Sequence, residues 1–412
     1  MLLLKQNKLT LALLSAGLLF TTSNALAEES GSIAEAVTEG KAQVTLRYRY
    51  EFVDQDGFSK NANASTLRTR LNYRTSRWNG FSVFVEAENI SHVIVDNFNS
   101  GAGTSPPGKS IYPVVADPKG TEVNQAYLDY NFNDSSFLRG GRQRILLDNQ
   151  RFVGGVGWRQ NEQTYDAVSY TSSFSNKAKL FVGYVWNVNR IFGGDVPAGD
   201  HEQDTFLANL AFPIAGAGKL VGYWYDIDNQ DAATFSTSTF GAKWAGKVGG
   251  DEAKFTYALE YAYQTDKANN PVDYSAKYYR LDAAFKFQPL TIFVGFESLG
   301  GDQNRSGAAF RTPLATLHAF NGWADKFLAT PNAGLNDFFV GAKGEFGKNK
   351  WTLVYHDFAA EDGSGDYGSE FDAVLVTPIN KHYSLLFKAA FYSGDTVYPD
   401  TTKLWLMATA KF

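Results

Sequence analysis

The sequence predicts an all-β protein: a single transmembrane antiparallel β-barrel of about eighteen strands, with sixteen as the lower bound. Three observations predict this fold. A secretory leader stands at the N-terminus, apolar and polar residues alternate with period two along the chain, and short and long connections succeed one another regularly. The mean hydropathy of −0.27 is too low for a bundle of helices in lipid. A barrel tolerates it, because only every second strand residue must be apolar.

The N-terminus has the three parts of a secretory signal. Lys5 and Lys8 precede an apolar stretch from Leu9 to Phe20, and Ala25-Leu26-Ala27 is an A-x-A cleavage site. The apolar stretch is too short for a membrane helix, which needs about 20 such residues. We therefore predict a cleaved signal peptide at residues 1–27, a short acidic periplasmic segment at 28–40, and the barrel at 41–412.

Strict alternation is clearest in three segments. Their apolar faces are Val44/Leu46/Tyr48/Tyr50/Phe52, Phe255/Tyr257/Leu259/Tyr261/Tyr263 and Tyr279/Leu281/Ala283/Phe285/Phe287. The opposite faces are mostly polar, as in Thr45, Arg47, Arg49 and Glu51. In a pore-forming barrel the apolar face contacts lipid and the polar face lines a wet lumen. We place strands at 42–53, 65–75, 80–91, 122–132, 136–145, 164–173, 177–188, 204–213, 217–227, 235–247, 252–264, 275–287, 289–299, 336–347, 349–359, 369–379, 382–393 and 402–412.

The connections between these strands alternate in length without a break. The long ones include residues 54–64, 92–121, 146–163, 189–203, 300–335 and 360–368, and short turns alternate with the long connections. Bacterial outer-membrane barrels have this pattern of periplasmic turns and outer loops, with an even strand number and both termini in the periplasm. The last strand ends in Phe412, and a terminal aromatic residue is typical of chains inserted into the outer membrane of Gram-negative bacteria.

The composition excludes several classes of function. The chain has no Cys, and its mature part carries 36 basic and 43 acidic residues without a basic run, which argues against a nucleic-acid partner. Its five His residues are scattered, and His201-Glu202 lacks the second His of a zinc-protease helix. We therefore expect no enzyme, no catalytic residue, no metal site and no cofactor. A divalent cation bound by acidic loops beside lipopolysaccharide is an alternative to ordinary solvated turns.

Basic residues concentrate in the first third of the barrel. Residues 41–160 hold 15 basic and 11 acidic residues, whereas residues 161–412 hold 21 and 28. An outward charge at mid-depth would cost about 2–4 kcal/mol, so charged strand residues should point into the lumen, where arginines favour anions. The alternative is that they pair with inward acids and stiffen the wall. The pore-lining candidates are Arg47, Arg49, Glu51, Arg68, Arg70, Arg74, Glu86, Asp129, Arg142 and Arg144.

Two long loops carry aromatic and charged residues suited to a constriction. Apolar residues recur at helical spacing in the 300–335 loop, which predicts a short amphipathic helix that enters or covers the pore. Aromatic rings beside charges can stack on a sugar and bind its carboxylate. The constriction candidates are Arg151, Trp158, Arg159, His318, Trp323 and Asp325.

Several blocks of sequence resemble the alginate-export-type outer-membrane porins, over nearly the whole mature chain. They include RYRYEFVDQDG, GGRQRILLDNQRFVGGVGWRQNEQTYDAV and TPLATLHAFNGWADKFLATPNAGLNDFFVGA. The resemblance implies a monomeric barrel of eighteen strands and an Arg-rich anionic path, onto which Arg47, Arg49, Arg68, Arg70, Arg142, Arg144, Arg151 and Arg159 match. The chain is shorter than the dedicated exporter, and it is acidic beyond the first strands.

Three functions fit these observations. The first is a passive outer-membrane channel for anionic oligosaccharides such as alginate, in contact with lipid and lipopolysaccharide. The second is a general diffusion porin for small hydrophilic solutes, and the third is a structural or adhesive barrel without conductance. The first predicts anion selectivity, the second weak selectivity, and the third no current.

Overall fold

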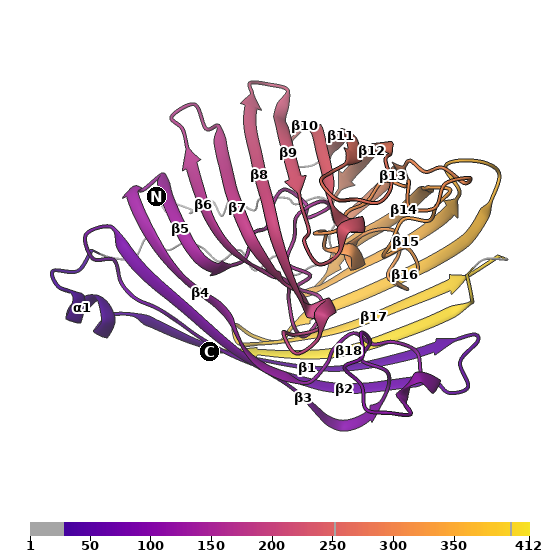
Figure 1. Ribbon diagram of the computed structural model, residues 1–412, viewed down its shortest axis with the longest axis horizontal. Coiled ribbons are helices and arrows are strands. Elements are labelled where there is room, and N and C mark those ends of the chain that lie inside the picture. The colour runs from indigo at the N-terminus through magenta and orange to yellow at the C-terminus, as the bar shows by residue number, and fades with distance from the viewer. Residues whose placement is uncertain (1–28, 251–252, 396–397) are drawn as a thin grey trace.

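The computed structural model describes residues 29–250, 253–395 and 398–412, so the predicted signal peptide lies outside the described residues. Within these ranges eighteen strands form one antiparallel sheet. The sheet closes on itself because β1 pairs with both β2 and β18 (Figure 1). The prediction of a single barrel of about eighteen strands is confirmed.

The strands follow one another around the barrel in chain order. They are β1 (Lys41–Gln55), β2 (Ala62–Arg74), β3 (Phe81–Asn97), β4 (Gly120–Asn133), β5 (Ser136–Gln143), β6 (Thr164–Ser173), β7 (Lys179–Asn189), β8 (Asp200–Ile214), β9 (Gly218–Ile227), β10 (Thr237–Gly249), β11 (Ala253–Asp266), β12 (Ser275–Phe287), β13 (Leu290–Leu299), β14 (Leu335–Phe346), β15 (Asn349–Ala359), β16 (Asp366–Pro378), β17 (Tyr383–Ser393) and β18 (Thr401–Lys411).

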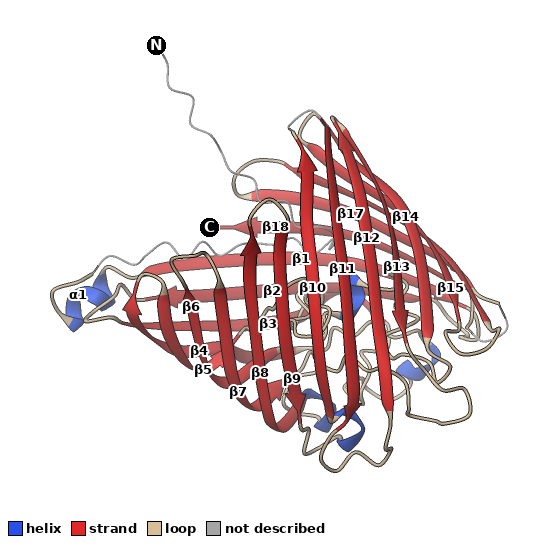
Figure 2. Ribbon diagram, turned by 90° about the horizontal axis from the view of Figure 1, so that it is seen from above, coloured by secondary structure: helices blue, strands red, loops and turns tan. Residues whose placement is uncertain are grey.

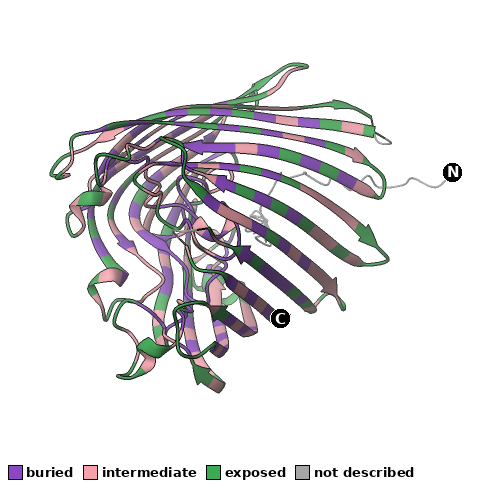
Figure 3. Ribbon diagram, turned by 90° about the vertical axis from the view of Figure 1, so that its right-hand side faces the viewer, coloured by how far each residue is buried: buried purple, intermediate pink, exposed green. Residues whose placement is uncertain are grey.

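Side chains alternate between the two faces of each strand as the sequence predicts. In β12, Ala276, Tyr278 and Arg280 are buried on the lumen side, whereas Tyr279 and Leu281 are exposed on the outside. Figure 3 shows this alternation as stripes along the strands. The exposed apolar residues form the surface that contacts lipid in a membrane, and the polar residues are buried inside the barrel.

The connections alternate between short turns at one end of the barrel and longer loops at the other. Turns such as 134–135, 288–289 and 347–348 contrast with the loops 98–119, 144–163 and 300–334. β3 continues to Asn97, beyond the predicted end of that strand at 91, so the following loop is shorter than expected. Thr45 of β1 pairs with Lys411 of β18, which places the beginning and the end of the barrel at the end with the short turns.

Residues 29–40 pack against this end of the barrel. Their helix α1 (Ile33–Thr38) is capped by Ser32, whose hydroxyl accepts a hydrogen bond from the Glu35 amide at 3.2 Å. Its Ala36 carbonyl accepts a bond from the Ser76 amide at 2.9 Å. The acidic segment is therefore docked on the turn between β2 and β3. In the described part of the chain no helix is long and apolar enough to span a bilayer.

The loops 144–163 and 300–334 bend back into the barrel, where Val153 of the first pairs with Leu314 of the second. Figure 2 shows the barrel and its connecting loops from above. The loop 300–334 holds a single short turn of 3₁₀ helix, η4 (Leu317–Ala319), so the prediction of an amphipathic helix there is wrong. Its apolar residues Leu314, Phe320 and Phe327 are buried, but against barrel-wall strands and the loop 144–163. The regular spacing of the apolar residues marked the positions that are buried, not a helix. They pack on the irregular surface inside the barrel, which offers no straight groove for a helix. The prediction that this loop enters the pore is confirmed.

The outward faces generate a first prediction. Leu281 lies at the middle of β12 and is 49% exposed, so Leu281→Arg should destabilise the barrel in lipid vesicles by about 2–4 kcal/mol. Val248 is equally outward but lies near the end of β10, and Val248→Arg should cost about 0–1 kcal/mol. Urea unfolding in vesicles measures both. Equal costs would contradict a membrane-spanning arrangement of these strands.

Candidate functional site in the barrel lumen

Four arginines of β1 and β2 form one patch of the inner wall, which we call the basic wall: Arg47, Arg49, Arg68 and Arg70. Arg47 lies directly opposite Arg68 in the register of the two strands. None of the four residues is more than 7% exposed. The sequence predicted that they project into open water, and this is wrong, because the inner loops cover them.

Two of the four arginines have carboxylate partners. Arg49 contacts Asp117 at 3.1 Å and Glu51 at 3.7 Å, and Arg70 forms ion pairs with Glu88 and with Glu162, the latter at 3.3 Å.

The other two arginines of the basic wall differ. Among the described residues, no carboxylate lies within ion-pair distance of Arg47 or Arg68. Half of the basic wall is therefore charged without a neutralising partner, in a position where a buried charge normally requires one.

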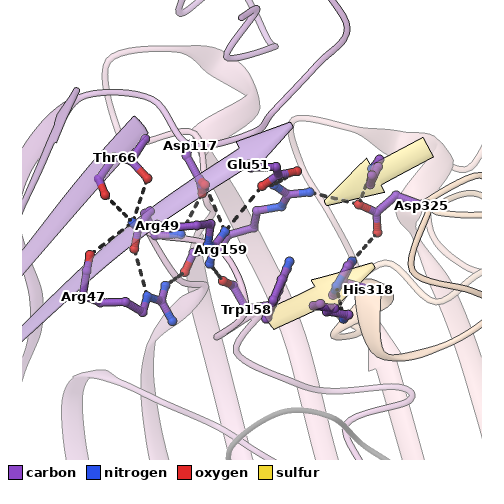
Figure 4. Close-up of polar contacts among 12 residues, drawn as sticks. Arg47, Arg49, Glu51, Thr66, Asp117, Trp158, Arg159, His318 and Asp325 are labelled. Atoms are coloured by element: carbon purple, nitrogen blue, oxygen red, sulfur yellow. Dashed lines mark hydrogen bonds and ion pairs between the residues drawn. The ribbon is translucent and has the colours of Figure 1, made fainter. Parts of the chain in front are cut away.

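Three guanidiniums of the basic wall bind the backbone of the loop 144–163 at residues 157–160, which we call the bridge segment. Arg47 donates to the carbonyls of Gly157, at 3.0 Å, and of Arg159. Arg49 donates to the Trp158 carbonyl, and Arg68 to the Gln160 carbonyl at 3.3 Å. Figure 4 shows Arg47 and Arg49 of β1 beside Trp158 and Arg159 of this segment.

The Gln160 side chain strengthens this attachment. Its Oε1 accepts a hydrogen bond from Arg47 Nε at 2.9 Å, and its Nε2 donates to Thr66 Oγ1 at 2.8 Å. Its backbone amide donates to Asp117 Oδ1 at 2.7 Å. The uncharged side chain of Gln160 is fully buried, and both of its polar atoms are hydrogen-bonded, one to β1 and the other to β2.

Another part of the inner wall, on strands β13 to β16, is acidic. Glu297 of β13, Asp337 of β14, and Glu370 and Asp372 of β16 are all buried there, and we call them the acidic wall. Glu370 Oε1 accepts hydrogen bonds from the backbone amides of Trp323, at 2.5 Å, and Ala324, at 2.7 Å.

The side chain of Asn321 makes further contacts with the acidic wall. It donates to Glu297 at 2.7 Å and to Asp337 at 3.1 Å. The loop 300–334 thus presents N–H groups to carboxylates, whereas the bridge segment presents carbonyls to guanidiniums.

The two loops meet in the lumen through Arg159 and Asp325. Arg159 forms ion pairs with Glu51 at 3.2 Å and with Asp325 at 2.9 Å. Asp325 also contacts Lys403 of β18 at 2.9 Å and His318 at 2.7 Å. Burial is the largest effect on the carboxyl of Asp325, but its neighbouring charges and hydrogen bonds outweigh it and hold its pKa well below the usual range. Asp325 is therefore the anion that joins both loops to the wall.

An aromatic cluster lies beside this junction. The rings of Trp158 and His318 are stacked with centroids 4.7 Å apart. Lys388 of β17 places its ammonium group 3.8 Å from the Trp323 ring and 4.2 Å from the Trp158 ring, within cation–π range. Its Nζ is 2.7 Å from His318 Nε2. Burial, then the nearby ammonium group, lower the pKa of His318 well below 6.5 against the opposing effect of Asp325, so the imidazole is neutral.

Further along the barrel a second charged cluster ties β2 to β5. Glu86 is contacted by Arg144 at 2.5 Å and by the Asn124 amide at 2.7 Å. Asp129 accepts two hydrogen bonds from Arg139, at 2.6 and 2.9 Å, and forms an ion pair with Arg74 at 3.2 Å. These pairs stiffen the wall, which is the alternative that the sequence had left open.

Of the ten predicted pore-lining residues, nine lie on the lumen side: Arg47, Arg49, Glu51, Arg68, Arg70, Arg74, Glu86, Asp129 and Arg144. The prediction that Arg142 lines the pore is wrong. In the register of β5 it shares the outer face with Leu138, which is 39% exposed, and it forms an ion pair with Asp166 of β6 at 2.8 Å. It lies one residue from the end of the short strand β5, and Asp166 neutralises its charge.

All six constriction candidates lie in the two inner loops, inside the barrel. Arg151 joins them to the acidic wall through Glu297 at 2.8 Å. The sequence missed Asp117, Lys388 and the pair Glu370 and Asp372. Alternation could have found the last three, since each stands at an inward position of a strand. Asp117 lies in an irregular loop, where no periodicity marks it. Within the described ranges, no group of three or more His, Asp or Glu side chains is arranged to hold a metal ion.

The comparisons with known proteins agree with this architecture. The family model for alginate export matches residues 39–305, which is more than half of the chain. The chain belongs to the alginate export family. Among curated proteins, no match was found.

Solved structures share the barrel at low sequence identity. Acinetobacter baumannii OccAB2 is 17% identical with a TM-score of 0.70, over 92% of this chain and 99% of that one. Acinetobacter baumannii OccAB4 is 14% identical with a TM-score of 0.70, over 90% and 98%. Pseudomonas aeruginosa OpdK with vanillate is 13% identical with a TM-score of 0.68, over 90% and 98%. Family and fold together identify an outer-membrane porin that forms a channel for solutes, a class of channels rather than of enzymes.

Removing most of the loop 300–334 should widen the channel. This loop supplies Phe310, Trp323 and Phe327 to the buried cluster that fills the lumen. Replacing residues 303–331 with a short Gly-Ser linker should raise single-channel conductance in planar bilayers severalfold. The same replacement of the exposed turn 57–60, at the same end of the barrel, serves as control and should leave conductance unchanged. Equal conductance of the loop deletion and the native chain would place the loop outside the solute path.

Acidification should loosen this loop. Because its pKa is depressed, His318 remains neutral in the docked loop and binds a proton more readily once the loop is released. Docking stability is therefore highest above pH 6.5 and falls as the pH drops below that value. Proteolysis of the loop at pH 7.5 and 5.5 measures this effect, and His318→Gln should remove most of the difference. If the protease cuts the loop equally fast at both pH values, the result would contradict a neutral His318 in the docked loop.

Proposed function

We propose that the barrel is a passive channel for small anionic hydrophilic solutes, with sugar acids such as uronates and alginate fragments as the substrate class. The observation that carries this proposal is the pair Arg47 and Arg68, two inward guanidiniums for which the described residues provide no carboxylate. Guanidinium matches carboxylate geometry and stays charged at any physiological pH. The proposal contains no catalytic step and no bound cofactor.

The selectivity expected from this arrangement is modest. The acidic wall faces the same lumen, and Glu51 and Glu88 lie beside the basic wall. A carboxylate is attracted by several guanidiniums in turn, none of which binds it tightly enough to trap it. One of the structures that share the fold, that of OpdK, was determined with vanillate, and a carboxylate of this kind suits the basic wall.

The orientation and surroundings follow from the same proposal. The short turns, the acidic segment and both ends of the barrel would face the periplasm, and the long loops would face outward beside lipopolysaccharide. The barrel would act as a monomer after removal of the signal peptide. A general diffusion porin is the second candidate function, and the buried carboxylates of the acidic wall favour it, because they weaken any preference for anions.

The double substitution Arg47→Gln with Arg68→Gln tests the proposal. It removes two lumen charges and leaves no carboxylate without its partner. One unit charge at ~8 Å contributes about 0.5–2 kcal/mol at effective dielectric constants of ~80 to ~20, so the permeability ratio of anions to cations should fall at least about twofold. The reversal potential in a salt gradient across a planar bilayer measures this ratio.

Arg142→Gln is the matched control, since this arginine lies on the outer face. It should leave the reversal potential unchanged. If the double variant keeps the native reversal potential, the arginines of the basic wall serve only to hold the loop, and the general diffusion porin becomes the better description.

A further inference from the structure

The bridge segment occupies the basic wall in the way a ligand would. Two of its carbonyls and the Gln160 side chain accept hydrogen bonds from Arg47, and its other two carbonyls accept from Arg49 and Arg68. These acceptors are neutral amide oxygens. A carboxylate presents two charged oxygens to the same donors, and charge-assisted hydrogen bonds are roughly twice as strong as neutral ones.

The attachment leaves donors unused. Arg49 Nε and Arg68 Nε are buried and have no hydrogen-bond partner within the described structure. Both side chains are at most 6% exposed. Neutral carbonyls therefore satisfy this wall only in part, and an anion in the same place would bond to donors that the bridge segment does not reach.

The backbone next to the bridge segment is strained and can move. Val156 has φ of 50°, in the left-handed region that a β-branched residue rarely adopts. Such a conformation costs about 1–3 kcal/mol and persists only where other contacts hold it.

The neighbouring glycine, Gly157, has no close contact that would forbid a side chain, since the nearest atom to an added Cβ is Glu162 Oε2 at 3.9 Å. Packing therefore does not require a glycine at this position. The glycine gives the backbone of the bridge segment more conformational freedom, which would help it to leave the basic wall.

We propose that residues 157–160 are an internal ligand of the basic wall, and that a carboxylate solute opens the constriction by displacing them. This inference rests on the proposed function and adds its regulation. Displacement releases the Val156 strain and withdraws Trp158 from His318 and Trp405, whose rings it contacts in the closed lumen. The ion pairs of Arg159 with Glu51 and Asp325 tether the segment, so it swings aside and returns when the solute has passed.

Thiol accessibility tests the displacement, because the native chain has no cysteine. Asn161 is 3% exposed and its side chain contacts Glu122 at 3.0 Å, apart from the contacts of the bridge segment. In Asn161→Cys, reconstituted in liposomes, sodium galacturonate should raise the rate of labelling by a small water-soluble thiol reagent at least threefold. Galactose, and sodium chloride at equal ionic strength, should leave it unchanged.

Two variants complete the experiment. Ser169→Cys places a thiol at a wall position that is also 3% exposed, and galacturonate should not change its labelling. Gly157→Ala restricts the backbone without a clash and should reduce the effect of galacturonate on labelling at position 161 by about two- to fivefold.

The outcomes separate this inference from the proposed function. If the channel is anion-selective but galacturonate leaves the labelling at position 161 unchanged, the displacement of the bridge segment is overturned and the proposed anion channel is retained. A channel without anion selectivity overturns both. Faster labelling with galactose as well as with galacturonate also overturns the inference, because displacement would then not depend on charge.

Discussion

The absence of water in the bilayer core is the constraint from which the rest of this structure follows. Every strand must find hydrogen-bond partners on both sides, so the sheet has to close, and β1 does so by pairing with β18 as well as with β2. Closure leaves one face of each strand in lipid. The charged residues of the strands are thereby directed into the barrel, where they are buried beneath the inner loops and must find partners within the chain.

The chain meets that requirement with its own backbone. A peptide unit has a carbonyl on one side and an N–H on the other, and the two inner loops use them separately. Carbonyls of the loop 144–163 face the guanidiniums of Arg47 and Arg49, and N–H groups of the loop 300–334 face the carboxylate of Glu370. Neutral peptide groups of the two loops thus contact both the basic wall and the acidic wall, and the charged side chains of Arg159 and Asp325 join the loops to each other.

Much of the barrel could be predicted from the sequence, because alternation reports which face each strand residue occupies. Leu281 and Arg280 lie on opposite faces as expected. The same rule misplaced Arg142, because the positions of charges near a strand end are not constrained by hydrocarbon. The partners of the basic wall could not be predicted. Gln160 and Asp117 are brought to Arg47 and Arg49 by irregular loops, and no periodic pattern encodes their path.

The pairing of the first and last strands has a consequence for the order of assembly. The basic wall borders this seam, and Asp325 is bound by Lys403 of β18 on one side and by Arg159 on the other. These contacts join residues 166 and 78 positions apart in the sequence, and contacts of such long range form slowly because loop closure must come first. The junction of the two inner loops is therefore complete only when the C-terminal strand β18 is in place.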